Sequence, residues 1–270
     1  MTTTAVTTPP AAPVLAPGLP LRSGPTYWWT GYRTMLRWHL SSLRMWLMLL
    51  VMVQILLGVG YVLGFALFFD EIPRTAALWV STGTPVLNLI LLGLLLGPQL
   101  VAGIKQTGAY DFLQALPVPT TAAAAAWYTV TLIGGLPGMA ITLVTAQLRY
   151  DPGFRISWTV VPVTLLVVFT GTMAGYALSH AIDNPMTTQL VTQALVFLAM
   201  GFAPILFPAQ QMPHWLVAVN DWLPLGPSAD IIRASLTEGL VTDVGRDYLV
   251  VSAWGVVTGW LAIRALRRQK

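Results

Sequence analysis

Side chains that could carry out chemistry are scarce in this chain of 270 residues. Cysteine is absent, which excludes thiol nucleophiles, thiolate metal sites and disulfides. The three histidines, His39, His180 and His214, lie far apart, and none belongs to a HExxH zinc-binding pattern. The GxSxG pattern of serine hydrolases is missing as well. The sequence therefore predicts no catalytic residue, no cofactor-binding residue and no metal ligand.

Lysine occurs twice, as Lys105 and as Lys270 at the last position. A P-loop requires lysine followed by Ser or Thr, because that pair contacts the nucleotide phosphates and Mg²⁺. Lys105 is followed by Gln106, so the chain is predicted not to bind ATP through a P-loop. Asp183 and His180 lie at the predicted edge of a membrane run, where they do not form a proton relay inside the bilayer.

The elements that position these residues follow from the low charge of the chain. Charged residues make up 9% of the sequence, against about 25% in soluble proteins, and hydrophobic residues make up 56%. This composition excludes a water-soluble globule. Six runs carry no charge, and about 20 apolar residues in a helix cross a bilayer. We expect an all-α integral membrane protein whose six transmembrane helices cover about 45–69, 76–103, 122–147, 158–180, 189–207 and 247–265.

The N-terminal segment has a different composition. Residues 1–26 are mostly Thr, Pro and Ala with one charge, Arg22, and they lack the basic start and apolar run of a signal peptide. We expect a disordered cytoplasmic tail there and a single six-helix transmembrane domain over 27–270.

Charge asymmetry predicts the orientation in the membrane. With the N-terminus inside, the inner segments hold nine Lys or Arg and two acids, while the outer segments hold five Lys or Arg and eight acids. This distribution follows the positive-inside rule and places both termini in the cytoplasm. The net charge of +4 is thereby explained by topology and does not indicate nucleic-acid binding.

An amphipathic segment precedes the first span. Residues 27–44 interleave aromatic side chains with Arg33, Arg37 and Arg44 at near-helical spacing. This pattern predicts a helix in the membrane interface, with aromatics at headgroup level and arginines at the phosphates. The alternative is an early extension of the first span, which would place three arginines in hydrocarbon at ~2.5–3.5 kcal/mol each.

The segment before the last span is too long for one crossing. Residues 184–220 are uncharged over 37 positions, and Pro204, Pro208 and Pro213 interrupt them. Proline disrupts a straight helix, so we expect 208–246 to form two short re-entrant helices that dip into the outer leaflet.

Two motifs carry a family resemblance. Residues 108–119 read GAYDFLQALPVP, between the second and third spans. Before the last span, the prolines at 204 and 208, the sequence MPHWL at 212–216 and NDWLPL at 220–225 precede Arg233 and Gly239. Their order resembles the six-helix type-2 permeases of ABC exporters, the family of daunorubicin and other multidrug exporters.

The resemblance implies a coupling helix at 108–119 that docks on a separate ATPase. The residues expected to take part in ATPase coupling are Lys105, Tyr110, Asp111, Phe112, Leu113 and Leu116. The aromatic and leucine side chains can form an apolar knob, while Lys105 and Asp111 set its register. The alternative is an interfacial loop packed on its own bundle.

The 37-residue charge-free stretch indicates a second mechanistic element, an outer gate. Phe202, Leu206 and Phe207 near the end of the fifth span could exclude water as a hydrophobic constriction, or could simply face lipid or core. The residues that identify the re-entrant segment are Pro213, Trp215, Pro224 and Arg233.

These observations predict the permease subunit of an ABC exporter in the cell membrane. Its expected partners are two copies of a soluble ATPase that binds ATP and Mg²⁺, a second or homologous permease, and membrane lipid. An apolar bundle without charge inside its spans favours a lipophilic or amphipathic substrate, such as a drug, an antibiotic or a lipid-like compound. The alternatives are an intramembrane lipid-modifying enzyme and a membrane anchor that transports nothing.

Overall fold

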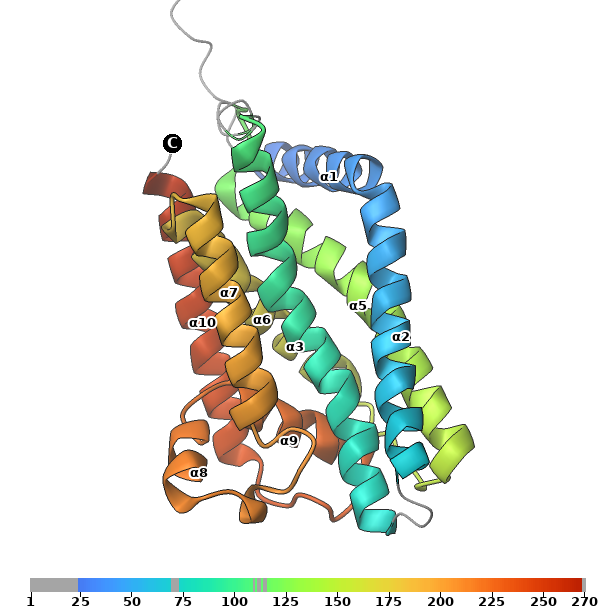
Figure 1. Cartoon of the computed structure of the whole chain (residues 1–270). Coiled ribbons are helices and arrows are strands. Elements are labelled where there is room, and N and C mark those ends of the chain that lie inside the picture. Colours follow the sequence, from blue (N-terminus) through green and yellow to red (C-terminus); the bar gives the residue numbers. More distant parts are fainter. Residues whose placement is uncertain (1–23, 69–72, 109, 111–112, 114–115, 269–270) are drawn as a thin grey trace, which may run out of the picture.

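A computed structural model of the chain describes residues 24–68, 73–108, 110, 113 and 116–268. Helices form every regular element of these ranges, and six of them are long and apolar enough to cross a membrane: α2, α3, α5, α6, α7 and α10. The expected all-α fold with six candidate spans is confirmed (Figure 1). Of the predicted tail at 1–26, residues 1–23 lie outside the described residues, while Pro25 and Thr26 already belong to α1. The elements in order are α1 (Pro25–Ser42), α2 (Arg44–Phe68), α3 (Arg74–Gln106), α5 (Thr120–Tyr150), α6 (Val160–Ala181), α7 (Pro185–Phe202), the 3₁₀ turn η1 (Ala209–Gln211), α8 (His214–Asn220), α9 (Leu225–Leu236) and α10 (Gly245–Arg268).

The fifth span differs most from its prediction, because α7 covers Pro185–Phe202 where the sequence predicted 189–207. It begins earlier because the Asn184 side chain accepts a hydrogen bond from the Met186 amide at 2.9 Å, with Pro185 in the first turn. It ends earlier because Pro204 has no amide hydrogen and disfavours helical geometry in Ala203, which is extended. Leu206 and Phe207 consequently lie in the connection after the helix.

The centre of the bundle is the contact between α3 and α6, where two pairs of glycines meet. A Cβ added to Gly93 would lie 2.6 Å from the backbone nitrogen of Thr172, and one added to Gly175 would lie 2.4 Å from the carbonyl oxygen of Gly93. Gly97 and Gly171 continue the same two ridges. Small residues at a spacing of four let membrane helices approach backbone to backbone, and this close contact defines the middle of the fold.

A reciprocal amide contact joins α2 to α3. The side-chain nitrogen of Gln54 donates to the carbonyl oxygen of Asn88, and that of Asn88 donates to the carbonyl oxygen of Gln54, each at 3.3 Å. Both side chains are buried. These two bonds between spans show how polar side chains within a membrane bundle join neighbouring helices.

The two ends of the bundle differ. Helix α1 lies across one end, while α8 and α9 lie at the other (Figure 1). Gly31 and Met35 form the buried face of α1, which packs on α5, and Arg33 and Arg37 are exposed. Arg44 differs from its prediction, because α1 ends at Ser42 and Arg44 is the exposed first residue of α2.

Candidate functional site

The described residues that were predicted to act in coupling and in gating lie at opposite ends of the bundle. Lys105, Tyr110, Leu113 and Leu116 belong to the α1 end, and the predicted gate and re-entrant residues belong to the α8–α9 end (Figure 1). Any communication between the two groups therefore has to run along the helices. Among the residues that the structure describes, no group of three or more His, Asp or Glu could hold a metal ion.

Lys105 joins the ends of two spans at the α1 end. It lies in the last turn of α3, and its Nζ donates to the carbonyl oxygens of Ser179 at 3.0 Å and Ile182 at 2.8 Å. These carbonyls belong to the C-terminal end of α6, where a positive charge also offsets the helix dipole. The same ammonium group lies 5.0 Å from the centre of the Tyr110 ring. Lys105 thus connects α3, α6 and the predicted coupling segment.

A continuous series of ring contacts runs from that segment into the bundle. The Tyr110 and His180 ring centres are 5.9 Å apart, those of His180 and Tyr176 are 4.3 Å apart, and those of Tyr176 and Trp127 are 6.0 Å apart. His39 of α1 completes the series at 5.0 Å from Trp127. The series links the coupling segment to α6, α5 and α1.

These rings surround a cavity of about 100 Å³ at the α1 end. Leu113 and Leu116 line it as well, so they contact their own bundle, as does Tyr110. Asp111 and Phe112 lie outside the described residues. Two buried atoms at this cavity have no hydrogen-bond partner within the part of the chain that the structure describes, Nε1 of Trp127 and Nδ1 of His39. Burial lowers the pKa of His39 to about 4, so this ring is neutral at neutral pH.

The start of α1 is attached to the other side of the coupling segment. Trp28 donates from Nε1 to the Thr121 hydroxyl at 2.9 Å, and the hydroxyls of Tyr32 and Thr129 are 2.9 Å apart. The Tyr27 hydroxyl donates to the carbonyl oxygen of Pro117. The predicted amphipathic helix is therefore fastened to the beginning of α5, directly after the segment expected to meet the ATPase.

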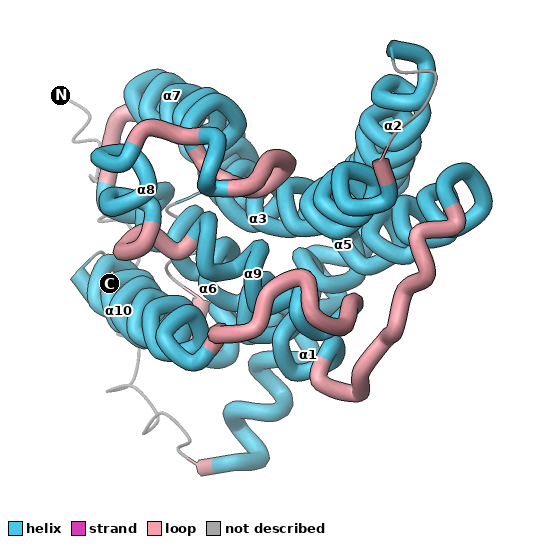
Figure 2. Tube along the Cα trace, turned by 90° about the horizontal axis from the view of Figure 1, so that it is seen from below, coloured by secondary structure: helices cyan, strands magenta, loops and turns pink. Residues whose placement is uncertain are grey.

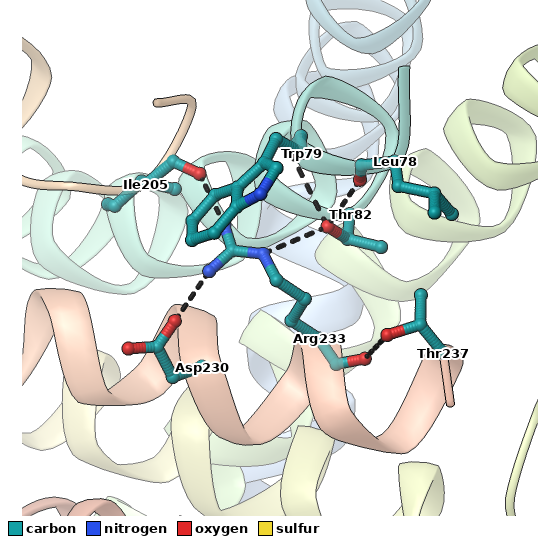
Figure 3. A network of polar contacts seen from close by, with 7 residues as sticks. All are labelled: Leu78, Trp79, Thr82, Ile205, Asp230, Arg233 and Thr237. Atoms are coloured by element: carbon teal, nitrogen blue, oxygen red, sulfur yellow. Dashed lines mark hydrogen bonds and ion pairs between the residues drawn. The ribbon is translucent and has the colours of Figure 1, made fainter. Parts of the chain in front are cut away.

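Arg233 organises the α8–α9 end from the last turn of α9 (Figure 3). Its fully buried guanidinium donates to Asp230 at 2.5 Å, to the Ile205 carbonyl oxygen at 2.7 Å and to the Thr82 hydroxyl at 3.2 Å. Trp79 covers its face, with 3.6 Å from the guanidinium carbon to the ring centre. This arrangement uses both the planar donor set and the stacking face of arginine.

The Arg233 network joins three segments that are distant in sequence: α9, α3 and the connection after α7. Its electrostatics follow from burial, which lowers the pKa of Arg233 to about 10 and raises the pKa of Asp230, while the two opposite charges counteract both shifts. A Cβ added to Gly83 would lie 2.2 Å from the Ile205 carbonyl oxygen, so the connection lies directly on α3. The segment that carries the predicted gate is thereby held against the central helix.

The three predicted gate residues do not converge within one chain. Phe202 lines a cavity beside α6 and α8. Leu206 and Phe207 line another cavity between α2 and α3, where the Phe207 ring centre is 6.1 Å from that of Phe65. Any ring formed by all three positions would need side chains from more than one chain.

Two of the residues predicted for the re-entrant segment directly precede the short helices. Pro213 directly precedes α8, and Pro224 directly precedes α9. Trp215 is exposed and lines the cavity that Phe202 also lines. The side-chain nitrogen of Asn220 donates to the carbonyl oxygens of Phe202 at 2.8 Å and Leu216 at 2.9 Å, which fastens α8 to the end of α7.

Several residues of the site were not predicted from the sequence. Tyr176 and Trp127 carry the ring series, and Trp79 and Thr82 complete the arginine network. An aromatic or threonine within an apolar span carries no local signal of function, because such residues are ordinary there. The nearest available indication would have been the pairing of Arg233 with Trp79, a tryptophan near the start of another span.

A comparison with known protein families finds a match over most of the bundle. Residues 86–264 are similar to the family described as ABC-2 family transporter protein. The matched region reaches from within α3 to α10 and covers more than half of the chain. The comparison with curated proteins finds no match.

Proposed function

From the premise that the chain belongs to the ABC-2 family of transporter proteins, we propose that it is the transmembrane permease subunit of an ABC exporter. The observation that carries this proposal is the family match over 86–264, which includes both the coupling segment and the α8–α9 end. Membership in this family implies an ATP-binding partner. In the proposed complex two copies of a soluble ATPase bind ATP and Mg²⁺, and this chain supplies no catalytic residue.

The proposed coupling route begins at residues 105–116. The bonds from Lys105 to the end of α6 and the ring series from Tyr110 to His39 support this route. A displacement of the segment by a closing ATPase would move α3, α6 and α1 together, because each is in direct contact with it. A loop without such contacts would absorb the displacement.

The proposed translocation path lies between two permease chains, either two copies of this one or this chain and a homologue. Helices α2 and α7 flank α3 on one side of the bundle, and both expose large apolar side chains, among them Leu56 and Phe197 (Figure 1). Phe202, Leu206 and Phe207 from both chains would close the path at the α8–α9 end by excluding water.

The proposed substrate is lipophilic or amphipathic, such as a drug, an antibiotic or a lipid-like compound. The mostly apolar lining of the cavity at Leu206 and Phe207 supports this class, because no charged residue among those lining it is placed to bind an ion. The proposed location is the cell membrane, with the α1 end and both termini in the cytoplasm, since the basic residues gather there.

Reconstitution tests the function. The chain is purified alone and with the P-loop ATPase encoded by a neighbouring reading frame, and both preparations are placed in liposomes. We expect no ATP hydrolysis by the chain alone, and ATP-dependent movement of a lipophilic dye by the complex. Hydrolysis by the chain alone would indicate an enzyme, and a stable complex that hydrolyses ATP without moving any lipophile would indicate an anchor.

A further inference from the structure

A cavity of about 530 Å³ lies where α3, α6, α7, α8, α9 and α10 meet. In the view along the bundle, α8 lies beside α7 and α10 at this end, with α6 and α9 further inside (Figure 2). The volume is within the range of about 300–1,000 Å³ typical of small-molecule sites. Its walls all come from one chain, so it is separate from the proposed path between two chains.

The cavity follows two helices for about two turns. On α7 its lining extends from Leu195 to Phe202, and on α6 it extends from Val167 to Ala174. Seven residue steps of α-helix correspond to about 10 Å. A space of this length holds several methylene groups of a hydrocarbon chain.

The lining offers few hydrogen-bonding groups to a polar ligand. No charged residue contributes to it. Thr170 and Thr258 donate to carbonyl oxygens within the bundle, Trp254 donates to the Trp222 carbonyl oxygen at 2.7 Å, and the Asn220 amide nitrogen donates to two carbonyls. With these donors used internally, a polar ligand would lose its hydrogen bonds to water without replacing them.

The cavity opens towards the surface of the bundle. Leu198 and Phe202 line it and are nevertheless 54% and 50% exposed, and Trp215 of α8 is exposed as well. These residues lie on or beside a candidate span, so the opening faces lipid in the membrane. Apolar surface of this kind does not hold ordered water, and hydrocarbon from the bilayer is available to fill it.

An arginine lies close to the cavity, beside the residues that follow Asn220 of its lining. Arg246 binds Asp221 at 3.2 Å, and its guanidinium carbon lies 5.2 Å from the centre of the Trp222 ring. Asp221 and Trp222 directly follow the cavity residue Asn220, and Arg246 is about half exposed. An arginine next to an indole at the end of an apolar cavity matches the polarity of a phospholipid, whose phosphate follows its hydrocarbon chains.

We propose that this cavity binds one acyl chain of a membrane phospholipid whose headgroup lies at Arg246 and Trp222. The bound chain fills the space between α7 and α6, which otherwise make little contact. It also supports Phe202, whose carbonyl oxygen accepts a hydrogen bond from Asn220 and which lies three residues before Ile205, the carbonyl partner of Arg233. The lipid is a structural ligand of the gate-bearing helix, whatever the complex exports.

Photolabelling in a bilayer tests the proposal. The full chain is reconstituted in phosphatidylcholine nanodiscs that contain a phosphatidylcholine with a diazirine on one acyl chain, and the adducts are mapped by peptide mass spectrometry. We expect adducts on 195–203 and 215–225 in excess of those on the exposed face of α5, which includes Ile133, Leu136 and Val144. Ala174→Trp and Leu216→Trp fill the cavity from opposite walls and should lower this labelling by about tenfold, the ratio equivalent to ~1.4 kcal/mol of lost apolar burial.

Ala140→Trp is the matched control, because Ala140 is exposed on α5 and does not line the cavity. It should leave the labelling unchanged, and size-exclusion profiles and helical content identify any variant that fails to fold. If one filling variant does not fold, the other decides. Equal labelling of wild type and a folded filling variant, or labelling of the cavity segments no stronger than that of the exposed face of α5, would overturn the proposal.

Competition distinguishes the source of the ligand. Excess unlabelled phosphatidylcholine should displace the label, whereas tetraphenylphosphonium, a lipophilic cation, should not. Displacement by the cation and not by the phospholipid would assign the cavity to an exported compound and reject the lipid. Arg246→Gln should weaken labelling by the phospholipid probe and not by a diazirine fatty alcohol, and equal weakening of both probes would contradict the headgroup position.

Discussion

Arg233 combines full burial with bonds to three segments that approach one another only in the folded chain. A buried guanidinium is tolerated when its donors are paired. Removing it leaves its partners buried without the hydrogen bonds that offset the cost of their desolvation. The pair with Asp230 therefore differs from the exposed pair of Arg155 with Glu238 at the same end, in which the side chains are 69% and 68% exposed.

Replacing Arg233 should destabilise the protein strongly. In Arg233→Ala, Asp230 loses its counter-charge and the carbonyl of Ile205 loses its donor, and breaking a buried pair of this kind costs about 3 kcal/mol. The matched control Arg155→Ala breaks the exposed pair and should change the stability by less than about 1 kcal/mol. Thermal unfolding in detergent measures both. Equal destabilisation by the two changes would show that the network does not hold the connection after α7.

His39 should make the attachment of α1 sensitive to acid. Burial lowers its pKa from 6.5 to about 4, so the folded state binds a proton less readily than the unfolded state. A lowered pKa contributes stability that is complete above pH 6.5 and is lost as the pH falls towards 4. His39→Phe keeps an aromatic ring beside Trp127 and should flatten melting temperature against pH in this interval. His214→Phe, at an exposed position, should follow the wild-type profile, and a flattened profile there would contradict the assignment.

Among the elements, α3 has the most demanding environment, because it contacts α6 backbone to backbone and also carries the polar partners of α2 and α9. Its sequence contains Pro85 and Pro98, which are tolerated inside a membrane helix when neighbouring helices satisfy the freed backbone groups. The interface with α6 is formed by glycines, since any side chain there would meet backbone atoms that cannot move aside.

Alanine at Gly175 should separate α3 from α6. The added Cβ would lie 2.4 Å from the carbonyl oxygen of Gly93, and relieving such overpacking typically costs about 1–3 kcal/mol. Gly103→Ala on α3 is the control, because no atom lies within 4 Å of its added Cβ, and alanine favours a helix by up to ~1 kcal/mol. Thermal unfolding of both variants checks the prediction. A Gly175→Ala protein as stable as Gly103→Ala would contradict the close packing.

On the scale of the whole molecule, the predicted coupling segment and the predicted gate are connected through α3. Lys105 lies in its last turn, and Thr82 and Gly83 lie in its first half, against the connection after α7. A single continuous helix with both contacts provides a direct route for a displacement from one end to the other. The proposed exporter would thus transmit ATPase closure along one helix.

Lys105→Gln should uncouple the complex. The variant loses the charge that binds two α6 carbonyls and lies over Tyr110, so movement of the coupling segment no longer reaches α6. We expect ATP hydrolysis to persist while transport per ATP falls about tenfold, equivalent to ~1.4 kcal/mol of lost coupling. Arg37→Gln, exposed on α1, should keep the wild-type ratio. The ratio is measured as dye movement against phosphate release in liposomes, and an unchanged ratio in Lys105→Gln would reject this route.

Local composition was sufficient to predict the transmembrane helices. Six charge-free runs predicted six spans, because each span must be apolar along its own length. The prolines at 204, 208 and 213 predicted an interruption before the last span, and two short helices are present there. The end of the fifth span was placed too late, since apolarity continues beyond Phe202 although Pro204 ends the helix.

The sequence by itself determined that this chain is a six-span membrane protein without a P-loop, because hydropathy and missing residue types are properties of the chain alone. Only the tertiary structure decided that Arg233 binds Ile205, Thr82 and Asp230, that Tyr110 begins a ring series, and that a cavity lies beside α7. Such contacts join residues up to 151 positions apart. They depend on which face of each helix packs against its neighbour. When a span is apolar on every side, its sequence does not indicate which face is packed inside the bundle.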